Sequence, residues 1–344
     1  MIVLCTGASG FLGEHLLRRL VAAGHEVIAT SRWPRPQRPG VTWLVVDIVD
    51  QKSIFSAPVL AVVRAAECVV HAAGLYDLLA SSEDLYLQNV IGTANMLQLA
   101  RYMPQLRHFC HVSTVAVAGN YAGVFHEDMF DVGQSFHDAY ARTKFAAEHL
   151  VRSATYFKSR SCMRLGILVG DSQDGSISKI DGPYYIQRLL KRFAPTARRL
   201  EMLRFLPVPF AETSKLMVVP VDITADALVQ LLPVAAEFRE LRTYHLMGPA
   251  SQVSIRRFLV ALCDHYGITL EPLPIPAWMV PRRLATSLLI PPNVLPYLQL
   301  PWTFASANMA ADLPHFVVPK FADYAQVLFA AADSLHFAAK EPKI

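Results

Sequence analysis

The chain has 344 residues, of which 53% are hydrophobic and only 17% are charged, and its formal net charge is +4 at pH 7. This length can bury a large core in one large or two modest domains. The low charge content favours an apolar ligand, a membrane surface or an oligomer interface without choosing among them. The mild positive charge and the lack of a nucleic-acid-binding motif argue against DNA or RNA as a partner.

The first predicted elements are an apolar strand at Ile2–Cys5 and a helix at Phe11–Ala23, joined by a glycine-spaced turn. A helix N-terminus favours an anion through its free N–H groups and its dipole. Gly7 can adopt a backbone conformation barred to other residues, Gly10 lets a diphosphate approach, and Gly13 lets the helix lie close to the sheet. The spacing is G-x-x-G-x-x-G rather than G-x-G-x-x-G, and it predicts a dinucleotide site.

Strand and helix patterns alternate along the first two-thirds of the chain, which predicts an α/β fold of the Rossmann type, a doubly wound parallel sheet with helices on both faces. Beyond Gly170 this rhythm breaks and prolines become frequent. We expect a dinucleotide-binding domain at 1–170, with contributions from about 216–247, and a smaller region at 171–344 that mainly binds or covers substrate. The predicted strands are Ile2–Cys5, Glu26–Thr30, Thr42–Val46, Cys68–Ala72, His108–Ser113, Cys162–Val169, Leu216–Asp222 and Thr243–Met247, and further helices are predicted at Asp84–Tyr102, Gln134–Thr155, Ile223–Leu232 and Val253–His265.

Cellular location is predicted from the cysteines and from the lack of a leader. The five cysteines form no C-x-x-C pair, and the first strand begins at residue 2, so we expect a cytoplasmic protein without a metal site. The stretch Leu284–Ala311 carries no charge, but four prolines interrupt it, and each removes a backbone donor that lipid could not replace. We therefore expect a buried or interfacial segment there, which leaves peripheral membrane contact open.

The second chemistry-bearing motif is Tyr140-Ala141-Arg142-Thr143-Lys144, in the helix after the fifth predicted strand. Residues four apart share a helix face, so the Lys144 ammonium can sit near the Tyr140 phenol. A free phenol has a pKa of about 10, and a nearby cation lowers that pKa. Tyr140 is therefore a candidate general acid or base. Ser113 and Thr114 end the preceding strand, and either hydroxyl could donate to a substrate carbonyl.

Further motifs accompany these two along the chain. They are Asp47-Ile48 after the third strand, His71-Ala72-Ala73-Gly74 after the fourth, Asn89-Val90-Ile91-Gly92-Thr93, and Arg164-Leu165-Gly166-Ile167. Together with T-G-x-x-G-x-x-G at 6–13, Ser113-Thr114 and Tyr140-x-x-x-Lys144, they make the chain to about residue 270 resemble an extended short-chain dehydrogenase/reductase.

The resemblance implies an oxidoreductase in which Tyr140 exchanges the proton, Lys144 tunes it and holds the nicotinamide ribose, and Thr114 orients the substrate oxygen. Asn89 would have a structural or water-binding role, and Asp47 would contact the adenine. Ala118 stands where the family often has a tyrosine, as in its steroid-dehydrogenase-like branches. The implied cofactor-binding residues are Thr6, Gly7, Ser9, Gly10, Phe11, Leu12, Gly13, Asp47, Ile48, Ala72, Ala73, Gly74, Ser113, Tyr140, Lys144, Leu165 and Ile167.

The choice between NAD(H) and NADP(H) depends on the end of the second strand. NAD-dependent enzymes usually place an acid there to bind the ribose 2′-hydroxyl, but this chain has Arg32. Arginine matches phosphate geometry well, and Arg35 and Arg38 follow closely. The pattern favours NADP(H) over NAD(H); the alternative is that the three arginines belong to a solvated loop.

The substrate is predicted from a closer resemblance. The segments Leu75–Leu78, Val115–Gly119, Phe125–Phe130, Val169–Ser172 and Lys179–Tyr185 are similar to the thioester-reductase or fatty-acyl-reductase branch, which includes the male sterility domains. That resemblance implies an apolar or acyl substrate, free or linked to CoA or a carrier protein. A 3β-hydroxysteroid or 3-hydroxyacyl dehydrogenase stays open as an alternative, and so does a noncatalytic nucleotide sensor, although the intact catalytic set argues against a sensor.

A basic and apolar segment at 188–210 has two interpretations. It could dock on anionic lipid, CoA phosphates or an acidic carrier-protein helix, or it could pack one face on the core and solvate the other. A homodimer is also open, because dimers are common in the family that the chain resembles. The segment contains the basic residues Arg188, Lys191, Arg192, Arg198, Arg199 and Arg204 and the apolar residues Phe193, Leu200, Met202, Leu203, Phe205, Leu206 and Phe210.

Overall fold

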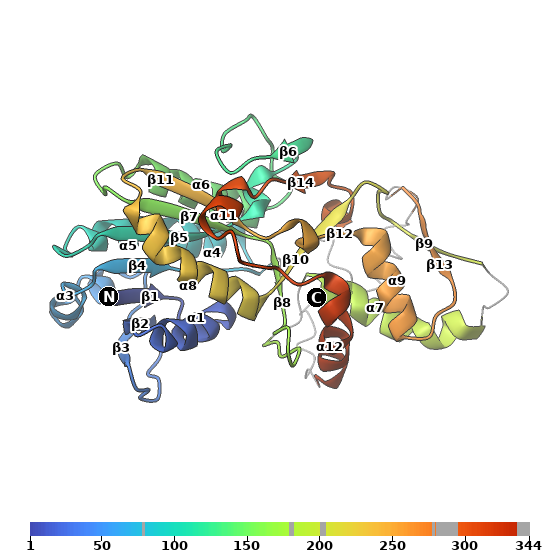
Figure 1. Cartoon of the computed structure of the whole chain (residues 1–344), viewed down its shortest axis with the longest axis horizontal. Coiled ribbons are helices and arrows are strands. Elements are labelled where there is room, and N and C mark those ends of the chain that lie inside the picture. Colours follow the sequence, from blue (N-terminus) through green and yellow to red (C-terminus); the bar gives the residue numbers. More distant parts are fainter. Residues whose placement is uncertain (78–79, 179–181, 200–203, 277–278, 280–294, 336–344) are drawn as a thin grey trace.

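The computed structural model describes residues 1–77, 80–178, 182–199, 204–276, 279 and 295–335 (Figure 1). Its largest element is a seven-stranded sheet in the order β11-β7-β5-β4-β1-β2-β3, in which every neighbouring pair is parallel. The doubly wound α/β fold predicted from the sequence is therefore confirmed. The strands are β1 (Ile2–Thr6), β2 (Glu26–Ser31), β3 (Val41–Val45), β4 (Cys68–His71), β5 (His108–Thr114), β7 (Arg160–Leu165) and β11 (Leu241–Leu246).

The strand order reverses at β1, since the chain runs from β1 outward to β3 on one side and from β4 outward to β11 on the other. In an open parallel sheet, ligands bind at the carboxyl ends of the strands beside such a reversal. The glycine turn follows β1 and the Ala72–Gly74 segment follows β4, so the topology brings both to this edge.

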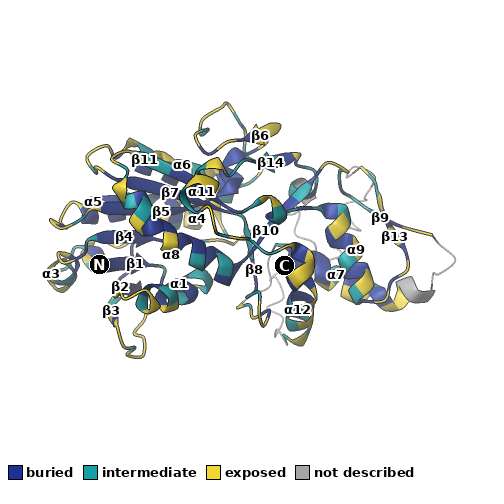
Figure 2. Cartoon of the chain, in the orientation of Figure 1, coloured by how far each residue is buried: buried dark blue, intermediate teal, exposed yellow. Residues whose placement is uncertain are grey.

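Helices cover both faces of this sheet, and its strands are buried between them (Figure 2). On one face α1 and α8 pack against each other through leucines, and on the other face α3, α5 and α6 contribute to a second apolar cluster. Burial of this apolar surface drives the assembly of the layers. The helices are α1 (Phe11–Ala22), α2 (Gln51–Ile54), α3 (Ala57–Val63), α4 (Ser82–Tyr86), α5 (Gly92–Ala100), α6 (Ala139–Ser153) and α8 (Val221–Glu237).

The strand predicted at Cys162–Val169 is in fact two strands in different sheets. After β7 the chain leaves the main sheet at Gly166, where a Cβ atom would lie 2.4 Å from the carbonyl oxygen of Met217. The next strand, β8 (Ile167–Val169), pairs instead with β10 (Lys215–Pro220). The prediction of one strand was wrong because the apolar run is continuous, and a close backbone approach leaves no mark on it except the glycine.

Two predicted helices also differ in detail. The helix expected at Asp84–Tyr102 is interrupted by a π-helical turn, η1 (Leu87–Ile91), between α4 and α5. The helix expected from Gln134 begins only at Ala139, because the Asp138 carboxylate accepts the Ala141 N–H at 2.7 Å and caps α6 there.

The rest of the chain builds a smaller layer beside the main sheet (Figure 1). A three-stranded sheet, β12-β10-β8, packs with three helices around an apolar core. Segments after residue 170 contribute to both layers. Strand β11 belongs to the main sheet and α8 packs on it, whereas β10 belongs to the small sheet. The predicted division into two domains at residue 170 therefore stays a proposal. The elements of this layer are α7 (Pro183–Arg199), β9 (Phe205–Val208), β12 (Gln252–Ser254), α9 (Ile255–His265), β13 (Glu271–Pro274), η5 (Leu295–Leu298) and α12 (Phe321–Ser334). Two late segments lie outside it: β14 (Trp302–Phe304) pairs with β6 (Gly123–Phe125), and α11 (Ala307–Asp312) packs against β11 of the main sheet.

Among the described residues, none of the helices combines the length and the apolar character needed to cross a membrane. Of the charge-free stretch Leu284–Ala311, residues 284–294 lie outside the described part, and the remainder forms η5, β14 and most of α11. The five cysteines are buried and unpaired.

Candidate active site

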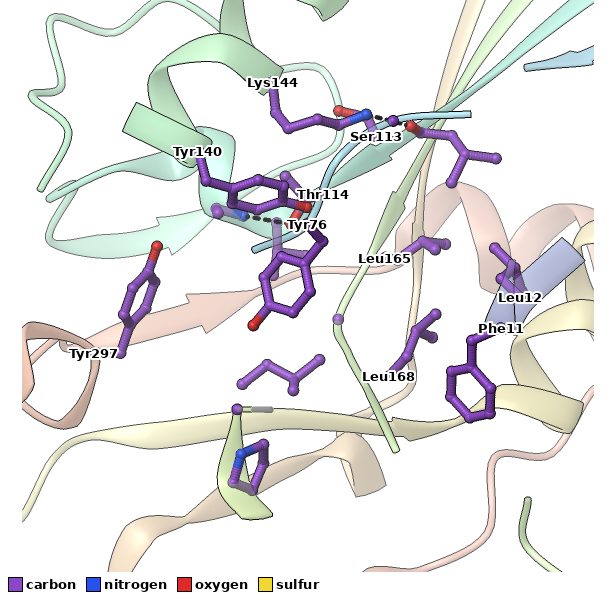
Figure 3. Close-up of a pocket in the computed structure, with 18 of the residues that line it drawn as sticks. Phe11, Leu12, Tyr76, Ser113, Thr114, Tyr140, Lys144, Leu165, Leu168 and Tyr297 are labelled. Atoms are coloured by element: carbon purple, nitrogen blue, oxygen red, sulfur yellow. Dashed lines mark hydrogen bonds between the residues drawn. The ribbon is translucent and has the colours of Figure 1, made fainter. Parts of the chain in front are cut away.

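A cavity of about 430 Å³ lies at the carboxyl ends of the main-sheet strands, between that sheet and β8 and β10 (Figure 3). Most of its lining is apolar, and its polar side chains gather where β5 and α6 meet. The sequence-predicted residues that line it are Phe11, Leu12, Ala72, Gly74, Asn89, Ser113, Thr114, Tyr140, Lys144, Leu165 and Ile167.

The glycine turn at the start of α1 fits a dinucleotide diphosphate. Gly7 has φ +68°, and a Cβ at Gly13 would lie 2.1 Å from the Gly7 carbonyl oxygen, so the turn's own backbone requires both glycines. Gly10 differs, because a Cβ there would meet only the Gly7 oxygen, at 3.2 Å, and the residue is exposed. No side chain caps α1 at Gly10, which leaves the first-turn N–H groups directed at the space where an anion would sit.

A buried chain of hydrogen bonds holds this turn against the segment after β4. The Thr6 hydroxyl accepts the Ala73 N–H at 3.1 Å and contacts His71 Nδ1 at 2.8 Å, and His71 Nε2 contacts the Thr93 hydroxyl at 3.0 Å. Burial, assisted by the charge of Lys144, lowers the pKa of His71 to about 3, so the imidazole is neutral. The Thr6 side chain therefore fixes the glycine turn against the segment after β4, the two segments that the sequence predicts to bind the cofactor.

Tyr140 and Lys144 extend from the first turns of α6 along one side of the cavity (Figure 3). The Tyr140 ring meets the Tyr76 ring edge to face, with centroids 4.9 Å apart. Lys144 is buried, and its ammonium donates to the Val112 carbonyl oxygen at 2.7 Å. Burial lowers the pKa of Lys144 to about 8, against the opposing charge of Glu148, so the side chain remains a cation at neutral pH.

The structure separates the two hydroxyls at the end of β5. Consecutive strand residues point to opposite faces, and the Ser113 hydroxyl donates to Glu148 at 2.6 Å. The Thr114 hydroxyl accepts the Ala116 N–H at 3.2 Å. Because it acts as an acceptor in this bond, its own hydrogen can be donated to a substrate oxygen. Of the two candidates, Thr114 is the one with a hydroxyl suited to a substrate oxygen.

Glu148 lies at the centre of a buried ion-pair cluster that the sequence analysis did not identify. It contacts Arg164 at 2.8 Å and Arg152 at 2.9 Å, and neither Glu148 nor Arg164 has solvent-exposed side-chain surface. Burial alone would raise the pKa of Glu148, but the two arginines and Ser113 together hold that pKa at about 2. The cluster joins α6 to β5 and β7, and the sequence signal for it was a glutamate four residues after Lys144.

Asn89 lies in the π-helical turn, a feature often found at functional sites. Its amide oxygen accepts the Leu75 N–H at 2.7 Å, and its amide nitrogen donates to the Leu75 oxygen at 3.2 Å and to the Thr143 hydroxyl at 3.1 Å. The side chain thus ties the segment after β4 to α6, which corresponds to the structural alternative of the two expected roles.

The three arginines after β2 are not equivalent. Arg35 and Arg38 pair with Glu14 of α1 at 2.9 and 3.3 Å, whereas Arg32 is exposed directly after the strand. Two of the three arginines that favoured a 2′-phosphate are therefore paired with the Glu14 carboxylate, and Arg32 is left as the candidate.

Ser9, Asp47 and Ile48 are also predicted to contact the cofactor, and the structure gives each of them a protein partner. The Ser31 hydroxyl donates to the Ser9 hydroxyl at 3.4 Å, which links the end of β2 to the glycine turn. One oxygen of Asp47 accepts the Val49 N–H at 3.1 Å. Ile48 is buried, and a Cβ at Gly92 would lie 2.6 Å from its side chain, so Ile48 packs into the core beside α5.

Residues 51–228, more than half of the chain, match the model of the NAD-binding family described as male sterility protein. The chain belongs to this family. It is an NAD(P)-dependent oxidoreductase of the extended short-chain dehydrogenase/reductase class, so the predicted class, its thioester-reductase branch and a nicotinamide cofactor are confirmed.

Curated relatives of this male sterility family protein include a 3-beta-hydroxysteroid dehydrogenase of Mycolicibacterium neoaurum, 31% identical over 43% of this chain and 42% of that protein. The isonitrile lipopeptide synthase of Streptomyces coeruleorubidus is 24% identical over 82% of this chain and 20% of that protein. The alignments thus span less than half the length of either relative. Among solved structures, the terminal R domain of the myxalamid PKS-NRPS pathway shares the fold, with a TM-score of 0.77 at 22% identity over 96% of this chain and 90% of that one.

Proposed function

We propose that this male sterility family protein uses NADPH to reduce the carbonyl of an apolar, acyl-like substrate, an acyl thioester or an aldehyde. One observation carries the proposal: the mainly apolar cavity reaches Thr114, Tyr140 and Lys144 at one end. Such a cavity would bind an acyl chain along its length and hold the carbonyl beside the groups that can protonate it.

When bound in the glycine turn, NADPH would supply a hydride to the carbonyl carbon. Thr114 would donate a hydrogen bond to the carbonyl oxygen, and Tyr140 would transfer its proton to that oxygen as the C–H bond forms. The ammonium of Lys144 would stabilise the phenolate left on Tyr140. A thioester would thereby become a hemithioacetal, which breaks its C–S bond to release a thiol and an aldehyde.

The preference for NADPH is the finer part of this proposal. Arg32 is exposed after β2, and the Ser9–Ser31 hydroxyl pair lies between that strand and the glycine turn. A 2′-phosphate there would receive hydrogen bonds from a guanidinium that Glu14 does not neutralise. We expect Arg32→Ala to raise the KM for NADPH at least tenfold and to change the KM for NADH little; equal changes would remove the argument.

A carrier-linked substrate is supported by the relatives, since one of them is a lipopeptide synthase. Arg188 and Arg192 are exposed on α7, while Lys191 pairs with Asp333 at 3.1 Å. This basic face could dock an acidic carrier-protein helix.

Part of the basic and apolar segment predicted from the sequence is not described by the structure. Leu200, Met202, Leu203 and the segment 179–181 lie outside the described residues, as do the side chains of Arg198 and Arg199.

A second candidate is the oxidation or reduction of a 3β-hydroxysteroid or 3-hydroxyacyl compound by the same residues. It is favoured by the 31% identity to a 3-beta-hydroxysteroid dehydrogenase. Consumption of NADPH, or its formation from NADP⁺, with sterols or 3-hydroxyacyl compounds alone would replace the acyl-reductase proposal.

The deciding experiment follows NADPH absorbance with long-chain acyl-CoA, an acylated carrier protein, a fatty aldehyde and a sterol panel. Tyr140→Phe should reduce kcat at least a hundredfold and leave NADPH binding intact, because general acid catalysis contributes roughly 10²–10⁴-fold. Tyr102→Phe, at a half-exposed tyrosine outside the cavity, is the matched control. Wild-type protein that binds NADPH but reduces no carbonyl compound would refute the proposal.

A further inference from the structure

Tyr297 forms an unexpected link between the cavity wall and the catalytic helix. It lies in η5 and lines the cavity with Leu298 and Trp302. Its hydroxyl donates to Asp138 Oδ2, and Asp138 stands two residues before Tyr140. Figure 3 shows Tyr297 at the side of the cavity near Tyr140 and Tyr76.

The Asp138 carboxylate has two separate roles. Its Oδ1 accepts the Ala141 N–H at 2.7 Å and so defines where α6 begins. Its Oδ2 accepts the Tyr297 hydroxyl. A carboxylate at a helix N-terminus is also favoured by the helix dipole. One side chain therefore caps the helix that carries Tyr140 and holds a cavity-lining segment that comes from far along the sequence.

The same wall is attached to the main layer at a second point. The Trp302 indole N–H donates to the Gly119 carbonyl oxygen at 2.8 Å, and β14 pairs with β6. The rings of Tyr297 and Trp302 meet edge to face with centroids 5.5 Å apart. Trp302 thus anchors the wall to the segment after β5, whereas Tyr297 connects it to α6 itself.

Tyr297 is a donor in this arrangement and not a second general acid. Burial raises its pKa well above the usual phenol range, and the negative charge of Asp138 raises that pKa further. The phenol therefore stays protonated, and its hydrogen is committed to the carboxylate. A phenol with such a raised pKa is poorly suited to exchange a proton with substrate.

We propose that Tyr297 is a positioning residue. Its hydrogen bond to Asp138 links the cavity wall, against which a bound substrate would pack, to the start of the helix that carries Tyr140. An acyl chain long enough to pack against Tyr297 would hold this link in place and so keep the proton donor aligned. The inference rests on the proposed carbonyl reduction, and it adds a dependence of turnover, not only of binding, on chain length.

Two variants remove the link in different ways. Tyr297→Phe keeps the ring and deletes the donor. Asp138→Ser keeps the helix cap, because serine caps helices well, but it lacks the second oxygen, Oδ2, that accepts the Tyr297 hydroxyl. We expect each variant to lower kcat for a long-chain substrate about tenfold, the cost of losing a hydrogen bond to a charged group. The double variant should be no worse than either single one, since both remove the same interaction.

Three controls separate positioning from general stability. The loss should shrink for a short-chain aldehyde that does not reach Tyr297, NADPH binding should not change, and Tyr102→Phe should behave as wild type. Equal losses for long and short chains, or multiplicative losses in the double variant, would overturn the proposal.

A measurement without substrate keeps the inference testable if the proposed function fails. Hydrogen exchange of Tyr297→Phe should be faster in the first turn of α6 as well as in 297–304, and exchange of Asp138→Ser should be faster in 297–304. If each variant altered only the segment that carries it, the coupling would be absent, whatever the substrate is. Coupled exchange without turnover of any carbonyl compound would instead reject the proposed function alone.

Discussion

Replacement of Lys144 by methionine should abolish turnover with NADPH and yet make the cofactor-free protein more stable at neutral pH. Methionine has a similar length and no charge, so it can occupy the buried site of the lysine stem. It removes an ammonium that is buried in the wild-type protein. It also removes the donor to the Val112 carbonyl oxygen, which accepts from Lys144 at 2.7 Å.

The size of the effect follows from the pKa of Lys144, which burial lowers from 10.5 to about 8. At about 1.4 kcal/mol per pKa unit, the buried charge costs about 3 kcal/mol below pH 8. Loss of the donor to Val112 costs about 1–2 kcal/mol in the variant. Lys144→Met should therefore be more stable than wild type by roughly 1–2 kcal/mol at pH 7, as the difference of these two terms.

The sign of the difference should reverse as pH rises. Between pH 8 and 10.5 the unfolded chain still binds the proton that native Lys144 has released, so wild-type stability rises with pH in this window. Above pH 10.5 the lysine is neutral in both states, and only the loss of the Val112 hydrogen bond remains. The variant should then be less stable than wild type by about 1–2 kcal/mol.

Urea unfolding of both proteins at pH 7, 8, 9 and 10, followed by circular dichroism, measures this difference. The exposed Lys158→Met is the matched control, and its difference from wild type should vary little with pH. A stability difference for Lys144→Met that stays constant from pH 7 to 10, or that moves in the opposite direction, would refute the assignment of a buried, destabilising charge.

Four other substitutions test the site. Thr114→Ala should lower kcat at least tenfold with little loss of stability. Ser113→Ala should instead mainly lower the urea midpoint, because Ser113 bonds to Glu148 and not to substrate. The reverse pattern would exchange the roles of the two residues. Glu148→Gln should destabilise the protein by about 3–5 kcal/mol at pH 7 in urea unfolding, since Arg164 loses its buried partner; a change below 1 kcal/mol would contradict this. Gly13→Ala should prevent stable folding or abolish NADPH binding in a fluorescence titration, because its Cβ would lie 2.1 Å from the Gly7 oxygen; tight binding by a stable variant would exclude that geometry.

Local sequence patterns were sufficient for most of the main sheet and for the place of the glycine turn and of the Tyr140–Lys144 pair in the fold. The apolar strands, the glycine turn and the Tyr140–Lys144 pair depend on contacts within a few residues, and their spacing records the period of a strand or a helix. The start of α6 was predicted at Gln134, five residues before its actual start at Ala139. The prediction followed the polar and apolar pattern and did not take account of the Asp138 cap, which begins the helix.

What the sequence by itself determined was the α/β fold, the glycine turn between β1 and α1, and the shared helix that carries Tyr140 and Lys144, all of which are encoded in short segments. Only the tertiary structure decided that the Ser113 hydroxyl is bound to Glu148 while the Thr114 hydroxyl is not, that Arg35 and Arg38 both pair with Glu14, and that the chain leaves the main sheet at Gly166. It alone brought Tyr297 to Asp138. These facts depend on pairs of residues far apart along the chain, and no local period of hydrophobic residues specifies which partner a distant side chain will meet.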